Sequence, residues 1–369
     1  SVLFYGLSFF GFICLVLLTL GLRQIIKKNN AKAGTPLVVL SVVLVVLGFY
    51  GFNSLDGDPY EDTSSAEETV DVAYLSEMGI ENPATKGNFE VDVFTYGSGT
   101  DEKRPEYADG VKMKTPTVDA SLLLPDWKGK KKKWRESYWG FGVDSFPLNA
   151  RVYMPKGDGP FPMVMMVHGN HSMLDYSDDG YGYLGELLAS RGIIGVSVDE
   201  NFINGHWSGD FMGKEMPTRG WLLLKHLEQW EKWNQESSSD LAGKVDLDNI
   251  VLVGHSRGGE AVSIAAAFNT LDRFPDNGNE KFDFCFGIKD FDGFKAGLYM
   301  NHANHGQFNS TWGRSDFGVP MKWLLNLKPL VSGEEQRQTA KVYVSAFAEA
   351  VLNGNMDYQP MFKNVDLVS

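Results

Sequence analysis

The chain has 369 residues, of which 43% are hydrophobic and 22% are charged, so it is long enough for one domain of ordinary size and an appendage. The net charge of −13 argues against a nucleic-acid binder, which would need a basic face to meet phosphates. The two cysteines, Cys14 and Cys285, lie far apart, which argues against a disulfide framework and a cysteine-ligated metal site.

Two uncharged apolar runs open the chain, Val2–Leu22 and Pro36–Phe52. About 20 apolar residues cross a bilayer core, so the first run is long enough and the second is at the short limit. A signal peptide is the alternative for the first run, but the run exceeds the usual apolar region and no small-residue cleavage site follows it. A buried core helix is the alternative for the second run. We predict a transmembrane hairpin over residues 1–52, with helices at about 2–22 and 36–52.

The loop between the two runs, residues 23–35, is short and basic. It contains Arg23, Lys27, Lys28 and Lys32. Short positive loops stay in the cytoplasm, so we expect an integral membrane protein whose remaining chain lies on the non-cytoplasmic side. The chain begins at Ser1 rather than Met, and we therefore expect sequence upstream, with room for further helices.

Residues 53–118 contain many Gly, Pro, Asp, Glu and Thr residues, and we interpret them as a linker with lead-in strands such as Phe89–Tyr96. The run Lys128–Arg135 is a local basic island. We interpret it as a solvated hairpin tip; contact with anionic lipid headgroups is the alternative.

Strands and helices alternate through residues 119–369, which predicts an α/β domain whose mostly parallel sheet has helices on both faces. The predicted strands are Ala150–Met154, Met163–Val167, Ile193–Val198, Ile250–Val253, Phe282–Lys289 and Ala296–Met300. The predicted helices are Tyr183–Ser190, Thr218–Gln235, Glu260–Phe268 and Gly333–Asn353.

The central motif is Gly254-His-Ser256-Arg-Gly258, a G-x-S-x-G pattern between an apolar strand and an Ala-rich helix. A serine on a tight strand-to-helix turn is strained and exposes its hydroxyl, and glycines two residues to either side let strand and helix pass closely. The helix N-terminus adds a positive dipole where negative charge develops. This context predicts that Ser256 is a catalytic nucleophile.

A second motif, Val167-His168-Gly-Asn170-His171, follows an earlier buried strand. In a nucleophile-elbow architecture, this loop donates one backbone N–H to the oxyanion hole and the residue after the nucleophile donates the other. The predicted donors are therefore Asn170 or His171, and Arg257. We expect His168 and His171 to orient the loop, and a metal site with Asp175 is the alternative that we do not favour.

The general base is expected after the nucleophile, which leaves His302 and His305 as candidates. Both lie on the loop that follows the predicted strand Ala296–Met300. His305 stands beside a glycine on this loop, which suits a ring that must reach over the serine, and we prefer it to His302.

These motifs resemble the α/β-hydrolase superfamily, in the branch of chlorophyllase-like, cutinase-like and platelet-activating-factor acetylhydrolase-like enzymes. The resemblance covers about Phe89 to the end of the chain and depends on Gly254–Glu260, Val167–His171 and Ala303–Phe308. It implies an α/β-hydrolase fold, here preceded by two transmembrane helices, with Ser256 as nucleophile and His305 as base in acyl transfer to water.

The acid of the expected triad should follow its own strand between Ser256 and His305, but too few residues separate the two for two further strands, their crossover helix and the acid loop. We predict that a block of sequence near residues 289–290, including the acid, is absent. Asp290 and Asp292 are the remaining stand-ins.

The leading hypothesis is a membrane-anchored serine hydrolase that cleaves a lipid or other hydrophobic carboxylic ester without a metal or other cofactor. Trp312, Phe317 and Met321 are candidates for an apolar acyl pocket, with core packing as an equal alternative. The rival hypotheses are a serine peptidase of the same fold and a catalytically silent subunit of a membrane complex. A homo-oligomer is compatible with each of them.

Overall fold

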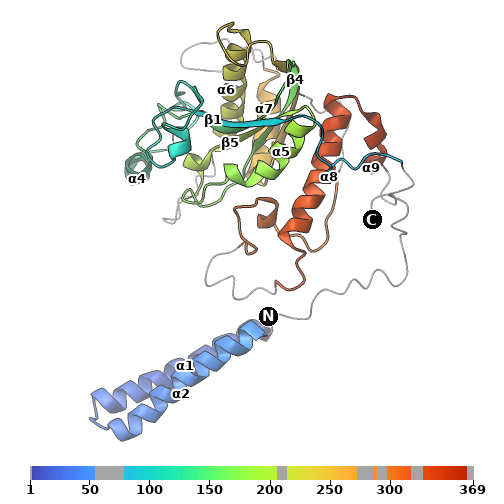
Figure 1. The fold of residues 1–369 in the computed structure, drawn as a ribbon. Coiled ribbons are helices and arrows are strands. Elements are labelled where there is room, and N and C mark those ends of the chain that lie inside the picture. The colour runs from blue at the N-terminus through green and yellow to red at the C-terminus, as the bar shows by residue number, and fades with distance from the viewer. Residues whose placement is uncertain are drawn as a thin grey trace. The chain divides into compact units, whose positions relative to one another are not determined.

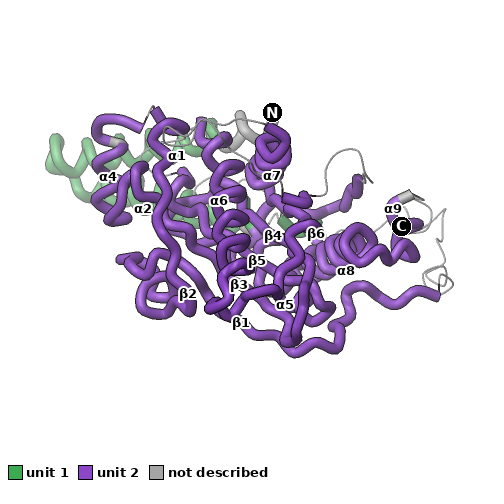
Figure 2. The backbone as a smooth tube through the Cα atoms, turned by 90° about the horizontal axis from the view of Figure 1, so that it is seen from above, with its two compact units in different colours: residues 1–62, 315–330 green, residues 63–314, 331–369 purple. Residues whose placement is uncertain are grey.

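A computed structural model describes residues 2–54, 79–125, 127–205, 214–271, 286–288, 297–316 and 327–363. The chain forms two compact units, which Figure 2 colours separately. Unit 1 comprises residues 1–62 and 315–330, and unit 2 comprises residues 63–314 and 331–369. The predicted break at Lys289–Asp290 lies outside the described residues.

Unit 1 contains two long apolar helices, α1 (Val2–Ile26) and α2 (Ala31–Ser54). By length and composition, the segments Ser8–Ile26 and Ala31–Tyr50 could each cross a membrane. The helices extend beyond the predicted limits of about 2–22 and 36–52. The basic residues Arg23 and Lys32 therefore lie at helix ends rather than in a loop.

Small residues allow α1 and α2 to pack closely against each other. The buried Ser41 hydroxyl donates to the Cys14 carbonyl oxygen at 2.8 Å. A Cβ atom on Gly34 would lie 2.5 Å from the carbonyl oxygen of Gly21, so only glycine fits there. A close approach through small residues is the usual way in which apolar helices associate in lipid.

Unit 2 is built on a mixed sheet of six strands, in the order β2-β1-β3-β5-β4-β6. Strand β3 is antiparallel to its neighbours β1 and β5, whereas β4 is parallel to both β5 and β6. The strands are β1 (Val91–Gly97), β2 (Met113–Lys114), β3 (Asn149–Pro155), β4 (Phe161–Val167), β5 (Ile194–Asp199) and β6 (Val245–Gly254).

Helices cover both faces of this sheet (Figure 1). The α-helices of unit 2 are α4 (Gly129–Trp139), α5 (Gly182–Ser190), α6 (Met216–Gln235), α7 (Arg257–Phe268), α8 (Gly333–Leu352) and α9 (Pro360–Lys363). Single-turn 3-10 helices are η2 (Pro105–Tyr107), η3 (Asp178–Tyr181), η4 (Asn201–Ile203), η5 (Gly306–Phe308) and η7 (Met356–Tyr358).

Strand β4 explains why both faces are covered, because it is buried on both sides and successive side chains point to opposite faces. Met163 and Met165 join the core cluster that contains side chains of α6 and α7. Val164 and Met166 join the cluster that contains side chains of α5 and α8. The sheet with helices on both faces is the α/β arrangement that the alternating pattern predicts.

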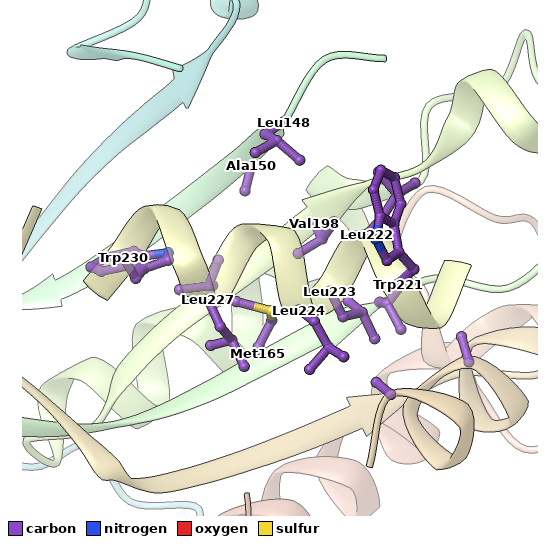
Figure 3. Packing of buried hydrophobic residues seen from close by; sticks show 14 of the residues in the cluster. Leu148, Ala150, Met165, Val198, Trp221, Leu222, Leu223, Leu224, Leu227 and Trp230 are labelled. Carbon is purple, nitrogen blue, oxygen red and sulfur yellow. The ribbon is translucent and has the colours of Figure 1, made fainter. Parts of the chain in front are cut away.

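The larger core cluster lies under α6. Trp221, Leu224 and Leu227 recur at helical spacing and are at most 1% exposed, and Figure 3 shows Leu224 and Leu227 close to Met165 of β4. Burying such a side chain stabilises the fold by about 1.5–3 kcal/mol. This packing fixes α6, whose first turn contributes to the site described below.

Two predicted elements differ from the structure. In the basic island at 128–135, Lys128 is the N-cap of helix α4 and the other residues belong to the helix instead of a hairpin tip. Residues 297–300 are not in a strand, and among the described residues only Phe286–Ile288 continue the sheet, through a parallel bridge between Ile288 and Ile250 of β6. A strand needs backbone partners, and the described part of the chain offers residues 297–300 none.

Candidate active site

Ser256 lies between β6 and α7, where the chain turns sharply from strand to helix. Its φ of 57° and ψ of −119° form a strained backbone conformation for a residue with a side chain, and the side chain is exposed. A Cβ atom on Gly254 would overlap the carbonyl oxygen of Gly258, so the turn requires glycine there. The sequence pattern therefore produces an exposed serine at the N-terminus of a helix.

The loop after β4 lies directly against this serine. The carboxyl ends of β4 and β6 are neighbours, because Val167 pairs with Gly254 and the His255 N–H donates to the Val167 carbonyl oxygen at 3.0 Å. A Cβ atom on Gly169 would lie 2.6 Å from the Ser256 Cβ and 3.2 Å from its Oγ. The structure thus brings the two sequence motifs together.

His168 orients this loop through hydrogen bonds of both ring nitrogens. Its Nε2 accepts a hydrogen bond from the Glu200 backbone N–H at 2.9 Å, so Nδ1 carries the proton and donates to the Gly169 carbonyl oxygen at 2.8 Å. Burial lowers the pKa of His168 to about 3, and the charge of Arg219 acts in the same direction. His168 is therefore a neutral structural residue at neutral pH.

The two residues predicted to offer an N–H group from this loop are held by different contacts. The Asn170 side-chain oxygen accepts a hydrogen bond from the Gly205 N–H at 2.8 Å. The ring of His171 stacks on Trp312, with 4.8 Å between ring centroids, and its Nδ1 lies 3.3 Å from an Asp175 carboxylate oxygen. Burial lowers the pKa of His171, while the Asp175 charge opposes that change.

His305 immediately precedes η5, and its ring lies beside the elbow. The centroid of the His305 ring is 4.8 Å from that of His255, the residue before Ser256, and 5.6 Å from that of Trp312. The His305 and Trp312 rings are nearly parallel, at 10°. These contacts bring the predicted base to the region of the predicted nucleophile.

His302 lies on the same loop with a positive φ of 58°. Its carbonyl oxygen accepts a hydrogen bond from the Val331 N–H at 3.1 Å, just before α8 begins. The ring contacts with His255 and Trp312 given above belong to the other candidate base, His305.

The loop that carries His305 and Trp312 is fixed on the segment around η3. Trp312 is 4% exposed, and its indole N–H donates to the Ser177 hydroxyl oxygen at 2.9 Å. The buried Asn309 side chain donates to the Ser177 carbonyl oxygen at 2.8 Å, and the Tyr183 hydroxyl donates to the Phe308 carbonyl oxygen at 2.9 Å. Hydrogen bonds of this kind hold the rings in place.

A buried ion pair in turn fixes η3. Arg104 donates to both carboxylate oxygens of Asp178, at 2.6 and 2.9 Å, and the Tyr107 hydroxyl donates to the same carboxylate at 2.6 Å. Burial alone would raise the pKa of Asp178, but the charge and hydrogen bonds of Arg104 lower it to about 2. Asp178 is ionised at neutral pH and holds the segment that supports Trp312.

Charged side chains where α6 begins contact the elbow directly and the loop after β4 through Glu200. Glu215 forms an ion pair with Arg257, the residue that follows Ser256. Arg219 is fully buried and donates to a Glu200 carboxylate oxygen at 2.9 Å. Because the Glu200 N–H is also the donor to His168, this turn is linked to both sides of the serine.

Glu200 combines complete burial with this arginine contact. Burial raises its pKa, while the charge of Arg219 and its hydrogen bond oppose that rise and favour the ionised carboxylate of the pair. Sequence reasoning did not find these ion pairs. The spacing of Glu215 and Arg219, four residues apart where a helix begins, suggests that they pair with each other, whereas Glu215 pairs with Arg257 and Arg219 with Glu200.

Several predicted site residues cannot be placed. Asp290, Asp292, Phe317 and Met321 lie outside the described residues. Within the described part of the chain, no group of three or more His, Cys, Asp or Glu residues is arranged to hold a metal ion.

Comparison with known proteins yields a short match. No protein-family model matches the chain. Two curated relatives, both named Esterase FrsA and from Shigella boydii serotype 18 (strain CDC 3083-94 / BS512) and serotype 4 (strain Sb227), are 40% identical to it over 53 residues. The matched stretch is 14% of this chain and spans 12% of the length of each esterase. The similarity is to a hydrolase and is confined to a small part of this chain and of each esterase.

Proposed function

We propose that the chain is a membrane-anchored serine hydrolase that cleaves carboxylic esters. The observation that carries this proposal is the strained, exposed Ser256 at a strand-to-helix elbow, with the Gly169 backbone against it and the His305 ring beside the preceding residue. The short match to an esterase supports the same reaction class.

The strand order supports an α/β-hydrolase fold for unit 2. Strands β1, β5, β4 and β6 run in one direction and β3 runs in the other, with the elbow following β6. Parallel strands that leave a nucleophile at a carboxyl edge are the arrangement in which the G-x-S-x-G elbow functions.

The proposed reaction proceeds through an acyl-enzyme. The Ser256 hydroxyl attacks the ester carbonyl while His305 accepts its proton. The backbone N–H of Arg257, with that of Asn170 or His171, donates hydrogen bonds to the developing oxyanion. His305 then protonates the leaving alcohol and activates the water that hydrolyses the acyl-enzyme. Asp290 and Asp292 remain the candidate acids.

The proposed substrate is a lipid or another hydrophobic ester that reaches the site at a membrane. Two helices of spanning length support the anchor. The basic residues at the turn of the hairpin support an orientation with this turn in the cytoplasm and unit 2 on the other side.

A panel of esters with increasing acyl length, assayed alongside matched peptide amides, tests this proposal. We expect ester hydrolysis by the chain in detergent micelles and its loss in Ser256→Ala. Ser263→Ala is the matched control, because Ser263 is an exposed serine on α7 whose hydroxyl donates to the Gly259 carbonyl oxygen. Preferential cleavage of the amides would indicate a peptidase, and inactivity towards both would indicate a silent subunit.

A further inference from the structure

Helix α4 presents a basic and aromatic face to solvent. The residues at positions i, i+3, i+4 and i+7 on a helix share one face, and here they are all exposed: Lys130, Lys133, Trp134 and Ser137. The indole of Trp134 is 50% exposed. Lysines together with a half-exposed tryptophan on one helix face are the combination found on helices that lie at a membrane surface.

The opposite face of α4 is held rigidly on unit 2. Arg135 and Trp139 are 3% and 2% exposed. The Arg135 guanidinium donates to the carbonyl oxygens of Phe202 at 2.8 Å and Asn204 at 2.6 Å, and it lies 4.8 Å from the centre of the Trp127 ring. The basic face therefore points in a fixed direction from the domain.

The charge of α4 contrasts with that of the whole chain. Lysine occupies five of the six positions from Lys128 to Lys133 in a chain of net charge −13. Such a cluster attracts phosphate groups at a bilayer surface, and a neighbouring tryptophan takes up the headgroup level, where one part of the ring is apolar and its N–H is hydrated. Views from two directions place α4 at the opposite end of unit 2 from α8 (Figures 1 and 2).

We propose that the exposed face of α4 docks on the non-cytoplasmic surface of the bilayer, at anionic lipid headgroups of that leaflet, with Lys130 and Lys133 against phosphates and Trp134 at headgroup level. This inference rests on the proposed membrane anchor, which turns docking into an event within one tethered molecule and so raises its effective concentration. Docking would hold unit 2 in one orientation on the surface from which an ester substrate comes.

Quenching of tryptophan fluorescence by brominated lipids tests the docking. The full chain is placed in nanodiscs of brominated phosphatidylcholine, or of the same lipid mixed with brominated phosphatidylglycerol. We expect additional quenching in the anionic discs, with most of that addition lost in Trp134→Phe. High salt should reverse it, because it shortens the range of the attraction.

Substitution of lysines in α4 is the second part of the docking test. Each lysine near an anionic surface should change the docking equilibrium about fivefold, so Lys130→Gln/Lys133→Gln should weaken docking by about 25-fold. Lys112→Gln/Lys156→Gln is the matched control; these are exposed lysines on another part of unit 2 that pair with Asp92 and Glu90. We expect this control to dock like the wild type.

Equal quenching in neutral and anionic discs, or equal weakening by both lysine pairs, would overturn the docking proposal. Retention in neutral vesicles after an alkaline carbonate wash tests the anchor separately. If the chain is washed off, the same variants are compared by cosedimentation with neutral and anionic vesicles, so the docking is tested in either case. Circular dichroism confirms that each variant is folded.

Discussion

At the scale of single residues, the geometry around Ser256 depends on neighbouring glycines, whose backbone can approach closely because they have no side chain. A positive φ costs a residue with a side chain about 1–3 kcal/mol, and the surrounding structure must supply that energy. Gly254 and Gly169 have no Cβ atom, which lets the backbone of β6 and of the loop after β4 approach the serine. The motif therefore predicts local geometry as well as chemistry.

Gly169→Ala should impair the proposed reaction selectively. The new Cβ would lie 2.6 Å from the Ser256 Cβ, so either the serine or the loop must move. A displacement of about 1 Å in a reacting group costs up to about 100-fold in rate. We expect kcat for ester hydrolysis to fall at least tenfold.

Gly313→Ala is the control for this variant, since a Cβ there meets no atom of the described residues within 4 Å. It should retain wild-type kcat. A Gly169→Ala enzyme with wild-type kcat would show that the loop after β4 has no part in positioning the nucleophile.

Some residue contacts could not be deduced from the sequence. The order of the motifs along the chain was enough to select His302 and His305 as candidate bases. The positions of His171, His255 and His305 along the chain could not show that all three rings contact the indole of Trp312. Such contacts join residues far apart in the chain, and no local pattern encodes them.

At the scale of elements, the start of α6 supports both halves of the proposed oxyanion hole. Glu215 pairs with Arg257 on one side of Ser256. Arg219 pairs with Glu200. The Glu200 backbone N–H donates a hydrogen bond to His168, which lies in the loop on the other side of Ser256. One helical turn thus positions two loops that the motifs alone would treat as independent.

Glu215→Gln should therefore lower kcat by about tenfold and leave KM almost unchanged, because the Arg257 N–H is needed mainly when the oxyanion forms. A double-mutant cycle with Arg257→Gln measures the connection. We expect the effects of the two single changes on the activation free energy to be non-additive by about 1 kcal/mol, most of the tenfold effect of Glu215→Gln. Strict additivity would mean that the ion pair does not act through Arg257.

The elements themselves were largely predictable where apolar residues follow a regular period, as in β4 and α6. Helix α4 was missed because its start is a run of lysines without that period. Its main anchors, Arg135 and Trp139, pack on distant segments, so tertiary contacts and not an apolar stripe determine its position. The predicted strand Ala296–Met300 failed for the opposite reason: its residues are apolar, but the described structure gives residues 297–300 no pairing partner.

At the scale of the whole molecule, buried histidines connect stability to pH. His226 is 1% exposed, its Nδ1 lies 2.7 Å from the Tyr96 hydroxyl oxygen, and burial lowers its pKa from 6.5 to about 3. In the unfolded chain this ring protonates near its ordinary pKa, whereas in the folded chain it stays neutral. Its contribution to stability is therefore present above about pH 6.5 and is lost as the pH falls towards 3.

His226→Asn removes this titration while retaining a polar atom for Tyr96. Between about pH 7.5 and about pH 5, the wild type should lose about 2 kcal/mol of unfolding free energy relative to the variant. Other buried groups, such as His168, titrate in both proteins and cancel in the difference. Denaturation in detergent micelles at the two pH values measures the difference in unfolding free energy between the wild type and the variant. If this difference does not change with pH, His226 is not a buried, neutral residue in the folded chain.

The overall arrangement was predictable as far as the chain alternates between strands and helices. The class of the fold, the two apolar helices and the elbow all follow from local patterns. The reversed direction of β3 and the order of the strands depend on pairing between distant segments. The triad acid remains a proposal, since Asp290 and Asp292 lie outside the described residues.

The most direct test of the central claim is covalent labelling of the full chain with a fluorophosphonate, followed by mass-spectrometric mapping of the modified residue. The proposed mechanism predicts one adduct, on Ser256, that is absent in Ser256→Ala, unchanged in Ser263→Ala and strongly slowed in His305→Gln. A wild-type chain that does not react, or an adduct that persists in Ser256→Ala, would contradict the proposal that Ser256 is the nucleophile of a serine hydrolase.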